Sequence, residues 1–243
     1  MIDLHAHLFP GLDDGARSWE EAVEMAQTAV ESGIETVAAT CHANLPGRDS
    51  SELVRVYRRR LEQFRELLEK ERIPLRLVEG MEIMDGPELV RKLKRGELLT
   101  INRTRYVLAE VRLDAPAWQI YRMLIYLLDA GYIPILAHPE RYRCVQRVPA
   151  HVKEWARMGA VLQLDKGSIF GRFGEGATNA ADYMLDRQLA SLAATDAHRA
   201  DVRTPSLAPL RDLLARRYGS ACPELLLREN PRRILEGQEV IRF

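Results

Sequence analysis

This sequence of 243 residues is short of the features that would place a protein in an obvious functional class at once. It has only three cysteines, an odd number without regular spacing, which is typical of a reducing compartment and argues against a disulfide framework. Its 35 basic and 35 acidic side chains cancel, so no net charge favours binding to nucleic acid or to an anionic membrane surface. The charge that matters for function must therefore be local.

Long apolar runs are missing as well. The most apolar stretch, residues 121–137, contains Arg122 and Asp129 and is interrupted by a glycine and a proline, so we do not expect it to span a membrane. We expect no signal peptide, because the candidate functional histidines begin at His5. The sequence therefore predicts a cytoplasmic protein that neither inserts into a membrane nor binds nucleic acid.

Short apolar runs alternate with helical patterns along the whole chain. Strands are expected near residues 2–4, 35–41, 75–82, 106–110, 133–137, 160–165 and 189–195. Helices are expected over residues 18–32, 51–72, 87–95, 116–130, 150–158, 177–187, 205–218 and 231–235. This alternation predicts parallel strands, and the length suits one α/β barrel better than two domains. No repeat or flexible linker divides the chain, so we expect a single domain over residues 1–243.

Histidines and acids collect at the ends of these apolar runs. Five of the six histidines and four acids lie at or just beyond the predicted strand ends: His5, His7, Asp14, His42, Glu82, Glu110, His138, Asp196 and His198. The C-terminal ends of barrel strands converge on one face, where barrel enzymes hold their chemistry. Imidazole and carboxylate ligands together suit zinc, iron or manganese. Any one of these side chains could instead be a helix cap or a hydrogen-bonded polar residue, but the whole set predicts a metalloenzyme with room for more than one ion.

Five motifs carry a resemblance to a known family. They are Met1-Ile-Asp-Leu-His-Ala-His7, Leu12-Asp-Asp-Gly15, Gly80-Met-Glu-Ile83, His138-Pro-Glu-Arg-Tyr142 and Thr195-Asp-Ala-His198. In this combination the chain resembles the polymerase-and-histidinol-phosphatase (PHP) superfamily, and within it the CpsB/CapC-type tyrosine-protein phosphatases of bacterial capsule and exopolysaccharide synthesis. The resemblance runs from Met1 to the tail at residues 230–235, so it covers essentially the whole chain.

The resemblance implies a distorted seven-stranded (β/α)7 barrel that holds three divalent metal ions, with manganese expected and iron or zinc as alternatives. The first ion would take His5, His7, Glu82 and Asp196, the second would share Glu82 and add Glu110 and His138, and the third would take Asp14, His42 and His198. No position of that pattern is missing, which argues against a non-catalytic copy. One departure is Asp165, where a neutral polar residue is expected. It could add charge near the site or cap the next helix.

The activity that the resemblance implies is hydrolysis of phosphotyrosine, by attack of a metal-bridging hydroxide on phosphorus. Arg141 and Arg203 match the family's phosphate-binding arginines and are the catalytic candidates, because phosphoryl transfer depends on positioning and charge neutralisation. Surface salt bridging is the alternative role for both arginines. Asp3, Asp13 and Glu140 could orient ligating histidines or act as turn and capping residues.

The implied substrate is the phosphotyrosine-bearing tail of a bacterial tyrosine kinase that controls polysaccharide export, and the resemblance also allows a homo-oligomer. A PHP phosphoesterase for a small metabolite such as histidinol phosphate would use the same chemistry with a different leaving group. An amidohydrolase is a more distant alternative. That class commonly bridges its metals with a lysine before the second pair of histidines, whereas Lys166 comes after His138. A non-enzymatic interaction module would be expected to have lost ligands, and none is lost.

Overall fold

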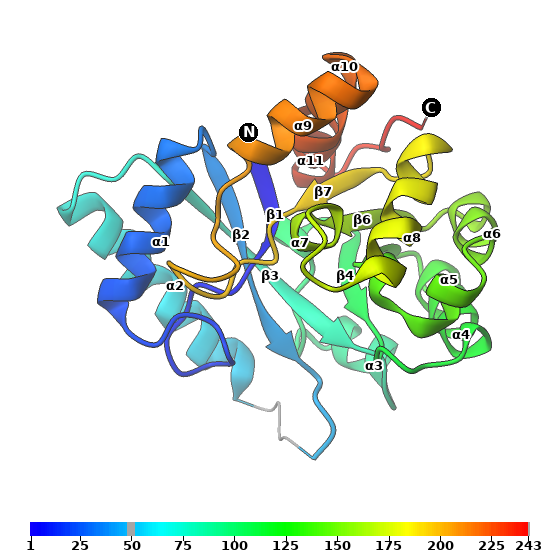
Figure 1. The fold of residues 1–243 in the computed structure, drawn as a ribbon. Helices are drawn as coiled ribbons and strands as arrows, with labels where there is room; N and C mark the ends of the chain where they lie inside the picture. Colours follow the sequence, from blue (N-terminus) through cyan, green and yellow to red (C-terminus); the bar gives the residue numbers. More distant parts are fainter. Residues whose placement is uncertain (48–51, 243) are drawn as a thin grey trace.

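The computed structural model describes residues 1–47 and 52–242 (Figure 1). Seven parallel strands form one sheet in sequence order: β1 (Ile2–Ala6), β2 (Thr36–Ala43), β3 (Arg76–Met84), β4 (Tyr106–Glu110), β5 (Ile133–Ala137), β6 (Val161–Asp165) and β7 (Leu192–Ala194). A parallel bridge between Ala6 and Ala197 brings the segment after β7 beside β1, and the amide of His7 donates to the carbonyl oxygen of Ala197 at 2.8 Å. The sheet is therefore a nearly closed barrel, which confirms the predicted fold class.

Helices surround this barrel (Figure 1). They are α1 (Trp19–Glu31), α2 (Leu53–Lys70), α3 (Leu89–Lys94), α4 (Ala117–Asp129), α5 (Arg143–Arg147), α6 (His151–Met158), α7 (Lys166–Ile169), α8 (Glu175–Asp186), α9 (Ala208–Tyr218), α10 (Ala221–Glu224) and α11 (Asn230–Leu235). Three tighter or wider turns complete the chain: η1 (Ile101–Arg103), η2 (Pro139–Arg141) and the π-helical η3 (Leu225–Glu229). Within the described ranges, no helix has both the length and the apolar character that crossing a bilayer would require.

The structure differs from the predicted elements mainly in short segments. The strand expected over residues 189–195 shrinks to the three residues of β7, because the amide of Thr195 donates to Oδ1 of Asp3 at 3.1 Å and so leaves the strand pattern. The short helices α5, α7 and α10 were not expected, and α8 begins at Glu175, two residues before its predicted start. The predicted helix start at Ser51 lies outside the described residues.

An apolar layer fills the interior of the barrel below the strand ends. Each strand contributes a buried residue to it: Leu4, Ala38, Val78, Leu108, Ile135, Val161 and Leu192. Ile101 of η1 and Ile234 of α11 join the same cluster, so the N-terminal end of the barrel is packed with side chains. Alternate strand residues point outward and pack against the helices. Polar side chains that face the barrel interior therefore lie at its C-terminal end.

A bulge in β1 turns both histidines of the N-terminal motif toward that end. The register with β2 shifts by one residue between Asp3 and Ala6, so two residues of β1, Leu4 and His5, lie opposite one residue of β2. A regular strand would send the residue after Leu4 to the outer face of the sheet. With the bulge, His5 and then His7 point inward, which is how bulges commonly re-aim side chains near functional sites.

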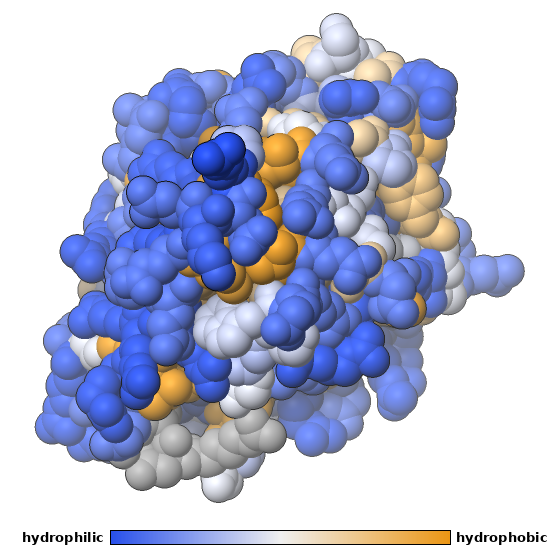
Figure 2. Space-filling view, turned by 90° about the vertical axis from the view of Figure 1, so that its left-hand side faces the viewer, coloured by the Kyte–Doolittle hydropathy of each residue, from blue (hydrophilic) through white to orange (hydrophobic). Residues whose placement is uncertain are grey.

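The long helix α2 illustrates how the helices cover the barrel. Its apolar residues recur every three or four positions, and Tyr57, Leu61, Phe64 and Leu68 are buried. Figure 2 shows the side of the molecule on the left of Figure 1, where α1 and α2 lie, and hydrophilic residues cover most of it. Burial of one helix face and solvation of the other fix α2 against β2 and β3.

Tyr57 provides a test of this packing. Its hydroxyl donates to the carbonyl oxygen of Ala39 at 2.7 Å and accepts from the amide of Gly80 at 3.0 Å, so it joins β2 to β3. Tyr57→Phe should lower the free energy of unfolding by roughly 1–3 kcal/mol, because both buried backbone groups lose that partner. Urea unfolding measures this as a lower midpoint at unchanged slope. The exposed Tyr126 is the control, and Tyr126→Phe should change stability by less than about 0.5 kcal/mol. Equal midpoints for the two variants would contradict the prediction.

Candidate metal centre

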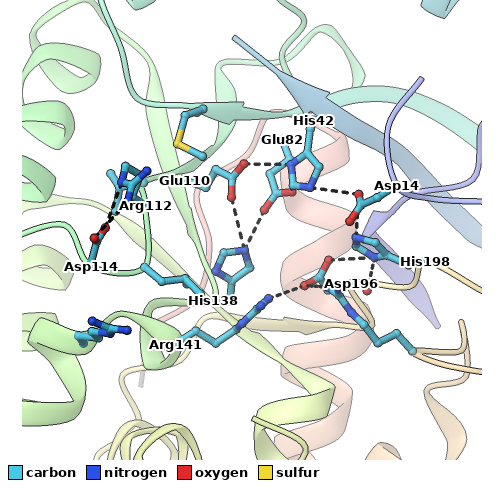
Figure 3. Close-up of a pocket in the computed structure, with 15 residues that line it drawn as sticks. Asp14, His42, Glu82, Glu110, Arg112, Asp114, His138, Arg141, Asp196 and His198 are labelled. Carbon is cyan, nitrogen blue, oxygen red and sulfur yellow. Dashed lines mark hydrogen bonds and ion pairs between the residues drawn. The ribbon is translucent and has the colours of Figure 1, made fainter. Parts of the chain in front are cut away.

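All nine predicted ligands lie together at the C-terminal end of the barrel. The strands β1 to β4 carry or are followed by His5, His7, Asp14, His42, Glu82 and Glu110, and His138, Asp196 and His198 follow β5 and β7. Figure 3 shows those that line the pocket, and their side chains point toward one another. Eight of the nine are mostly buried, whereas the Asp14 side chain is 64% exposed. The cluster therefore sits in the barrel mouth and opens to solvent near Asp14.

The first predicted set has the spacing of a closed metal site. Nε2 of His5 lies 3.2 Å from Nε2 of His7 and 3.2 Å from Oε2 of Glu82. Oδ1 of Asp196 lies 3.4 Å from the Nε2 atoms of both histidines. Four ligand atoms at about 2.0–2.2 Å from one ion, in tetrahedral directions, would lie roughly 3.3–3.6 Å apart. These separations match those expected around one divalent ion, and all four ligand atoms lie within 4.8 Å of one another.

The tautomers of the two histidines strengthen this fit. Nδ1 of His5 faces Oε1 of Gln163 at 2.9 Å, and Nδ1 of His7 faces Oδ2 of Asp13 at 2.7 Å. These acceptors assign the proton of each neutral ring to Nδ1, so both Nε2 lone pairs point at each other and at two carboxylates. Four electron-rich atoms so close together require a positive charge, which is supplied either by extra protons on the rings or by a metal ion.

The second and third predicted sets lie side by side, because His42 of the third set contacts Glu110 of the second. Nε2 of His138 lies 2.8 Å from Oε1 of Glu82 and 4.0 Å from Oε2 of Glu110. Nδ1 of His42 lies 3.0 Å from Oε1 of Glu110, and its Nε2 lies 3.5 Å from Oδ1 of Asp14. The same Asp14 oxygen lies 3.3 Å from Nε2 of His198. The structure thus brings the members of each set together, and the sets adjoin rather than stand apart.

Charge within the cluster is balanced between imidazoles and carboxylates. Burial disfavours a charged His7, yet hydrogen bonds to Asp13, Asp196 and Glu82 outweigh it and raise its pKa well above the ordinary value. For His42, burial is likewise outweighed by hydrogen bonds to Glu110 and Glu82, which raise its pKa to about 10. Burial also works against a charged Glu82, but the neighbouring histidines hold its pKa well below the usual range. Without metal ions, protons on the imidazole rings balance the negative charge of the carboxylates.

Two side chains orient the rings of His5 and His7. Asp13, one of three residues proposed for this role, binds His7, whereas Asp3 and Glu140 contact backbone amides and hydroxyl groups instead of the rings. The partner of His5 is Gln163, which was not predicted. The sequence feature that could have indicated Gln163 is its polar side chain inside the apolar run of β6, the one strand that supplies no candidate ligand.

Arg141 and Arg203 meet at the carboxylate of Asp196. Nη1 of Arg141 donates to Oδ2 of Asp196 at 2.9 Å, and Arg203 forms an ion pair with the same oxygen. Both arginines line a cavity of about 460 Å³ together with the exposed edge of the cluster (Figure 3). Surface salt bridging does not describe them, because their side chains are only 17% and 21% exposed.

Asp165 lies beneath this cavity and outside the candidate ligand sets. Its Oδ1 accepts from the amide of Gly167 at 2.6 Å and so caps α7, while its Oδ2 lies 3.6 Å from Nη1 of Arg141. Burial raises the pKa of Asp165 well above its ordinary value, and the nearby Asp196 and Glu140 carboxylates raise it further. Asp165 therefore caps the next helix and also adds a carboxyl group beside the site.

Three residues of the site have a left-handed backbone. The φ angles are 36° at His138, 47° at Asp196 and 56° at Arg203. Residues other than glycine seldom adopt this region, and each instance costs on the order of 1–3 kcal/mol. At His138 and Asp196 the sharp turn comes just after a strand, and at Arg203 it lies in the loop after β7. Such strain is typical of functional sites.

The fold and the site together define a parallel barrel with a candidate multi-metal centre at its carboxyl end. The protein-family profile described as "Capsular polysaccharide synthesis, CpsB/CapC" matches residues 1–236. The chain therefore belongs to the CpsB/CapC family.

Individual relatives agree with this membership along the whole chain. The tyrosine-protein phosphatase YwqE from Bacillus subtilis is 34% identical, with 100% of this chain and 94% of that protein covered. The tyrosine-protein phosphatase CpsB from Streptococcus pneumoniae is 30% identical over 98% of this chain and 99% of that protein. A chain from the crystal structures of these two proteins, described as unique metal-dependent tyrosine phosphatases, superposes with a TM-score of 0.92 at 32% identity and covers 100% of this chain and 97% of that one.

More distant structures share the fold alone. A protein from Listeria monocytogenes described as a putative histidinol phosphatase has a TM-score of 0.51 at 12% identity, with 83% of this chain and 96% of that one covered. The lysine that an amidohydrolase would need is not at the cluster, because Nζ of Lys166 donates to the carbonyl oxygens of Thr204 and Ser206. The amidohydrolase alternative therefore finds no support at this site.

Metal binding should release protons. His42 has a pKa of about 10 without ions, so at pH 7 its ring is protonated and must lose that proton before a nitrogen can bind a metal. Below pH 10, the apparent metal affinity should therefore rise with pH. Calorimetric titration at pH 7, in two buffers of different ionisation enthalpy, counts the protons released. The sixth histidine, His151, lies on α6, and His151→Gln should leave the count unchanged. A binding heat that does not depend on the buffer would contradict the prediction.

The carboxylate of Asp13 should matter for metal affinity although it is not a predicted ligand. Asp13→Asn removes the charged acceptor that fixes the ring of His7 and should weaken metal binding by about 10- to 100-fold. Competition with a chromophoric chelator measures this. Asp114→Asn is the matched control, because Asp114 lines the cavity beside the cluster but pairs with Arg112. Similar affinities for the two variants would exclude an orienting role for Asp13.

Proposed function

We propose that this protein is a metal-dependent protein-tyrosine phosphatase that acts as a single domain over residues 1–243. The observation that carries this proposal is the divided carboxylate of Asp196. Its Oδ1 faces the ring nitrogens of His5 and His7, while its Oδ2 faces Arg141 and Arg203. The candidate metal site and two arginines suited to binding phosphate thus share the side chain of Asp196. Phosphoryl transfer asks for this combination, because it depends on positioning and on neutralising negative charge.

Three divalent ions are proposed, held by the three sets expected from the family resemblance. Support comes from the spacing of the first set and from the imidazole and carboxylate groups that make up all three sets. The solved relatives are described as metal-dependent tyrosine phosphatases, which supports a metal requirement. Manganese is the expected metal, with iron or zinc as alternatives, because mixed nitrogen and oxygen ligands suit each of them.

When bound, the ions would supply a water molecule acidified toward a pKa of about 7 and positive charge next to the phosphate. The protein's own side chains would bind and orient the substrate. Arg141 and Arg203 present N–H donors to the phosphate oxygens. The apolar residues Met84, Val111 and Leu113 line the same cavity and can contact an aromatic ring. A tyrosyl leaving group has a pKa near 10, so it needs less protonation than an alkyl alcohol.

We infer that the substrate is the phosphotyrosine-bearing tail of a bacterial tyrosine kinase that controls polysaccharide export, encountered in the cytoplasm. The family description names capsular polysaccharide synthesis, and relatives from three genera are named as tyrosine-protein phosphatases or putative ones. These names support the substrate class, and the kinase follows from it, because a phosphotyrosine phosphatase needs a kinase that makes its substrate.

The first test compares three substrates: a phosphotyrosyl peptide, histidinol phosphate and a simple carboxylic ester. The metal-loaded protein should hydrolyse the phosphotyrosyl peptide with the highest kcat/KM. A chelator should abolish this activity, and His138→Ala should lower it by at least about a hundredfold, because the charge stabilisation of the bound ion is lost.

The outcomes separate the alternatives. A preference for histidinol phosphate would keep the chemistry and replace the substrate. Metal binding without phosphatase activity on any substrate would defeat the proposal. His151→Ala serves as the matched control, and a loss of activity equal to that of His138→Ala would point to damage outside the metal centre.

A further inference from the structure

The aromatic ring of Phe173 lies against both arginines of the site. The distance from the ring centroid to Cζ of Arg141 is 4.2 Å, and to Cζ of Arg203 it is 5.8 Å. A cation within about 6 Å of an aromatic centroid is attracted by the negative face of the ring. Phe173 belongs to the loop between α7 and α8, so one side chain from a third part of the chain contacts two guanidinium groups that are far apart in sequence.

The loop holds this ring in place from behind. A Cβ atom at Gly167 would come within 2.7 Å of Cε2 of Phe173, so the ring packs directly on the backbone of that glycine. The amide of Arg172 donates to the carbonyl oxygen of Gly167 at 2.9 Å, and Oγ1 of Thr178 donates to that of Ser168 at 3.0 Å. The first bond joins the loop to α7, and the second joins α8 to α7, so the loop that carries Phe173 is held between the two helices.

A stacked ring positions a guanidinium group in a way that a carboxylate does not. A carboxylate such as Asp196 occupies N–H donors of the arginine, whereas an aromatic face contacts the plane of the guanidinium and leaves the donors at its edge free. Nε of Arg203 is buried and has no hydrogen-bond partner among residues 1–47 and 52–242. Phe173 thus lies beside the two guanidinium groups without taking a hydrogen bond from either (Figure 3 shows Arg141 directed toward Asp196).

We propose that Phe173 is a positioning residue for phosphate binding: it holds the planes of Arg141 and Arg203 so that their free N–H groups face the same phosphoryl group. This role rests on the phosphatase function proposed above. Two like-charged guanidinium groups repel each other, and each long side chain loses rotamer freedom when it is ordered. The ring opposes both effects before the substrate arrives.

The same loop offers a matched control. Phe170 lies three residues before Phe173, and its side chain is 50% exposed. No arginine is stacked on Phe170 within the part of the chain that the structure describes. Phe170→Leu removes one aromatic ring from the same segment, as Phe173→Leu does, but it leaves the contacts of Phe173 with the arginines intact.

The test uses the metal-loaded full chain and two measurements, calorimetric binding of inorganic phosphate and hydrolysis of an aryl phosphate. Phe173→Leu should weaken phosphate binding about tenfold and raise KM by a similar factor, with a smaller loss of kcat. Phe173→Tyr keeps the ring face and should stay within about twofold of the wild type. Phe170→Leu should match the wild type. Metal content should be equal in all four proteins, because Phe173 is not a candidate ligand.

A double-mutant cycle shows whether the ring acts through the arginine. In an Arg141→Ala background the effect of Phe173→Leu on phosphate affinity should shrink to about threefold or less, because the nearer cation is gone. An undiminished effect would overturn the proposal. So would a phosphate affinity of Phe173→Leu within twofold of the wild type, or a Phe173→Tyr protein as weak as Phe173→Leu, which would reduce the role to packing volume.

These results are distinguishable from a failure of the proposed function. A wild-type protein that binds phosphate but hydrolyses no phosphate ester would defeat the phosphatase assignment, and the comparison of phosphate affinities would still decide the role of Phe173. An active wild type with an unaffected Phe173→Leu variant would defeat only the inference about Phe173. A wild type that binds no phosphate at all would defeat both.

Discussion

The carboxylate of Asp196 is the interaction on which the rest of the site depends. It contacts His5 and His7 through one oxygen and the two arginines through the other. A buried carboxylate is costly unless its charge is compensated, and here four cationic or potentially cationic groups compensate it. Any movement of this side chain would therefore displace the metal ligands and the phosphate donors together.

The barrel places that carboxylate where it can act. The apolar interior layer occupies the N-terminal half of the strands, and the bulge in β1 brings two imidazoles to the same level as Glu82 and Glu110. Backbone strain at His138 and Asp196 then turns the chain where a regular strand would continue, and Arg203 is strained in the loop after β7. The stability of the packed barrel offsets the cost of this strain.

Much of this arrangement could be predicted from the sequence, because its causes are local. Strand ends follow from apolar runs such as Ile133–Ala137, and ligand-type residues placed directly after them must meet once the strands are parallel. The residues that orient the site are harder to foresee. Gln163 reaches His5 only because closure of the barrel brings β6 within one strand of β1, although the two residues are 158 positions apart in sequence. The stacking of Phe173 depends on a loop path that no periodicity encodes.

The short pairing that closes the barrel also sets the order in which the site can form. The amide of Asp196 donates to the carbonyl oxygen of His5 at 2.9 Å, so the first and last ligand-bearing segments become neighbours only after nearly the whole chain is available. Contacts between such distant positions form late in folding. On a ribosome, the growing chain would expose its His-x-His motif for most of synthesis without the carboxylate of Asp196 that completes the first ligand set. A fully assembled first set is thus a mark of a finished chain, and a truncated product would lack it.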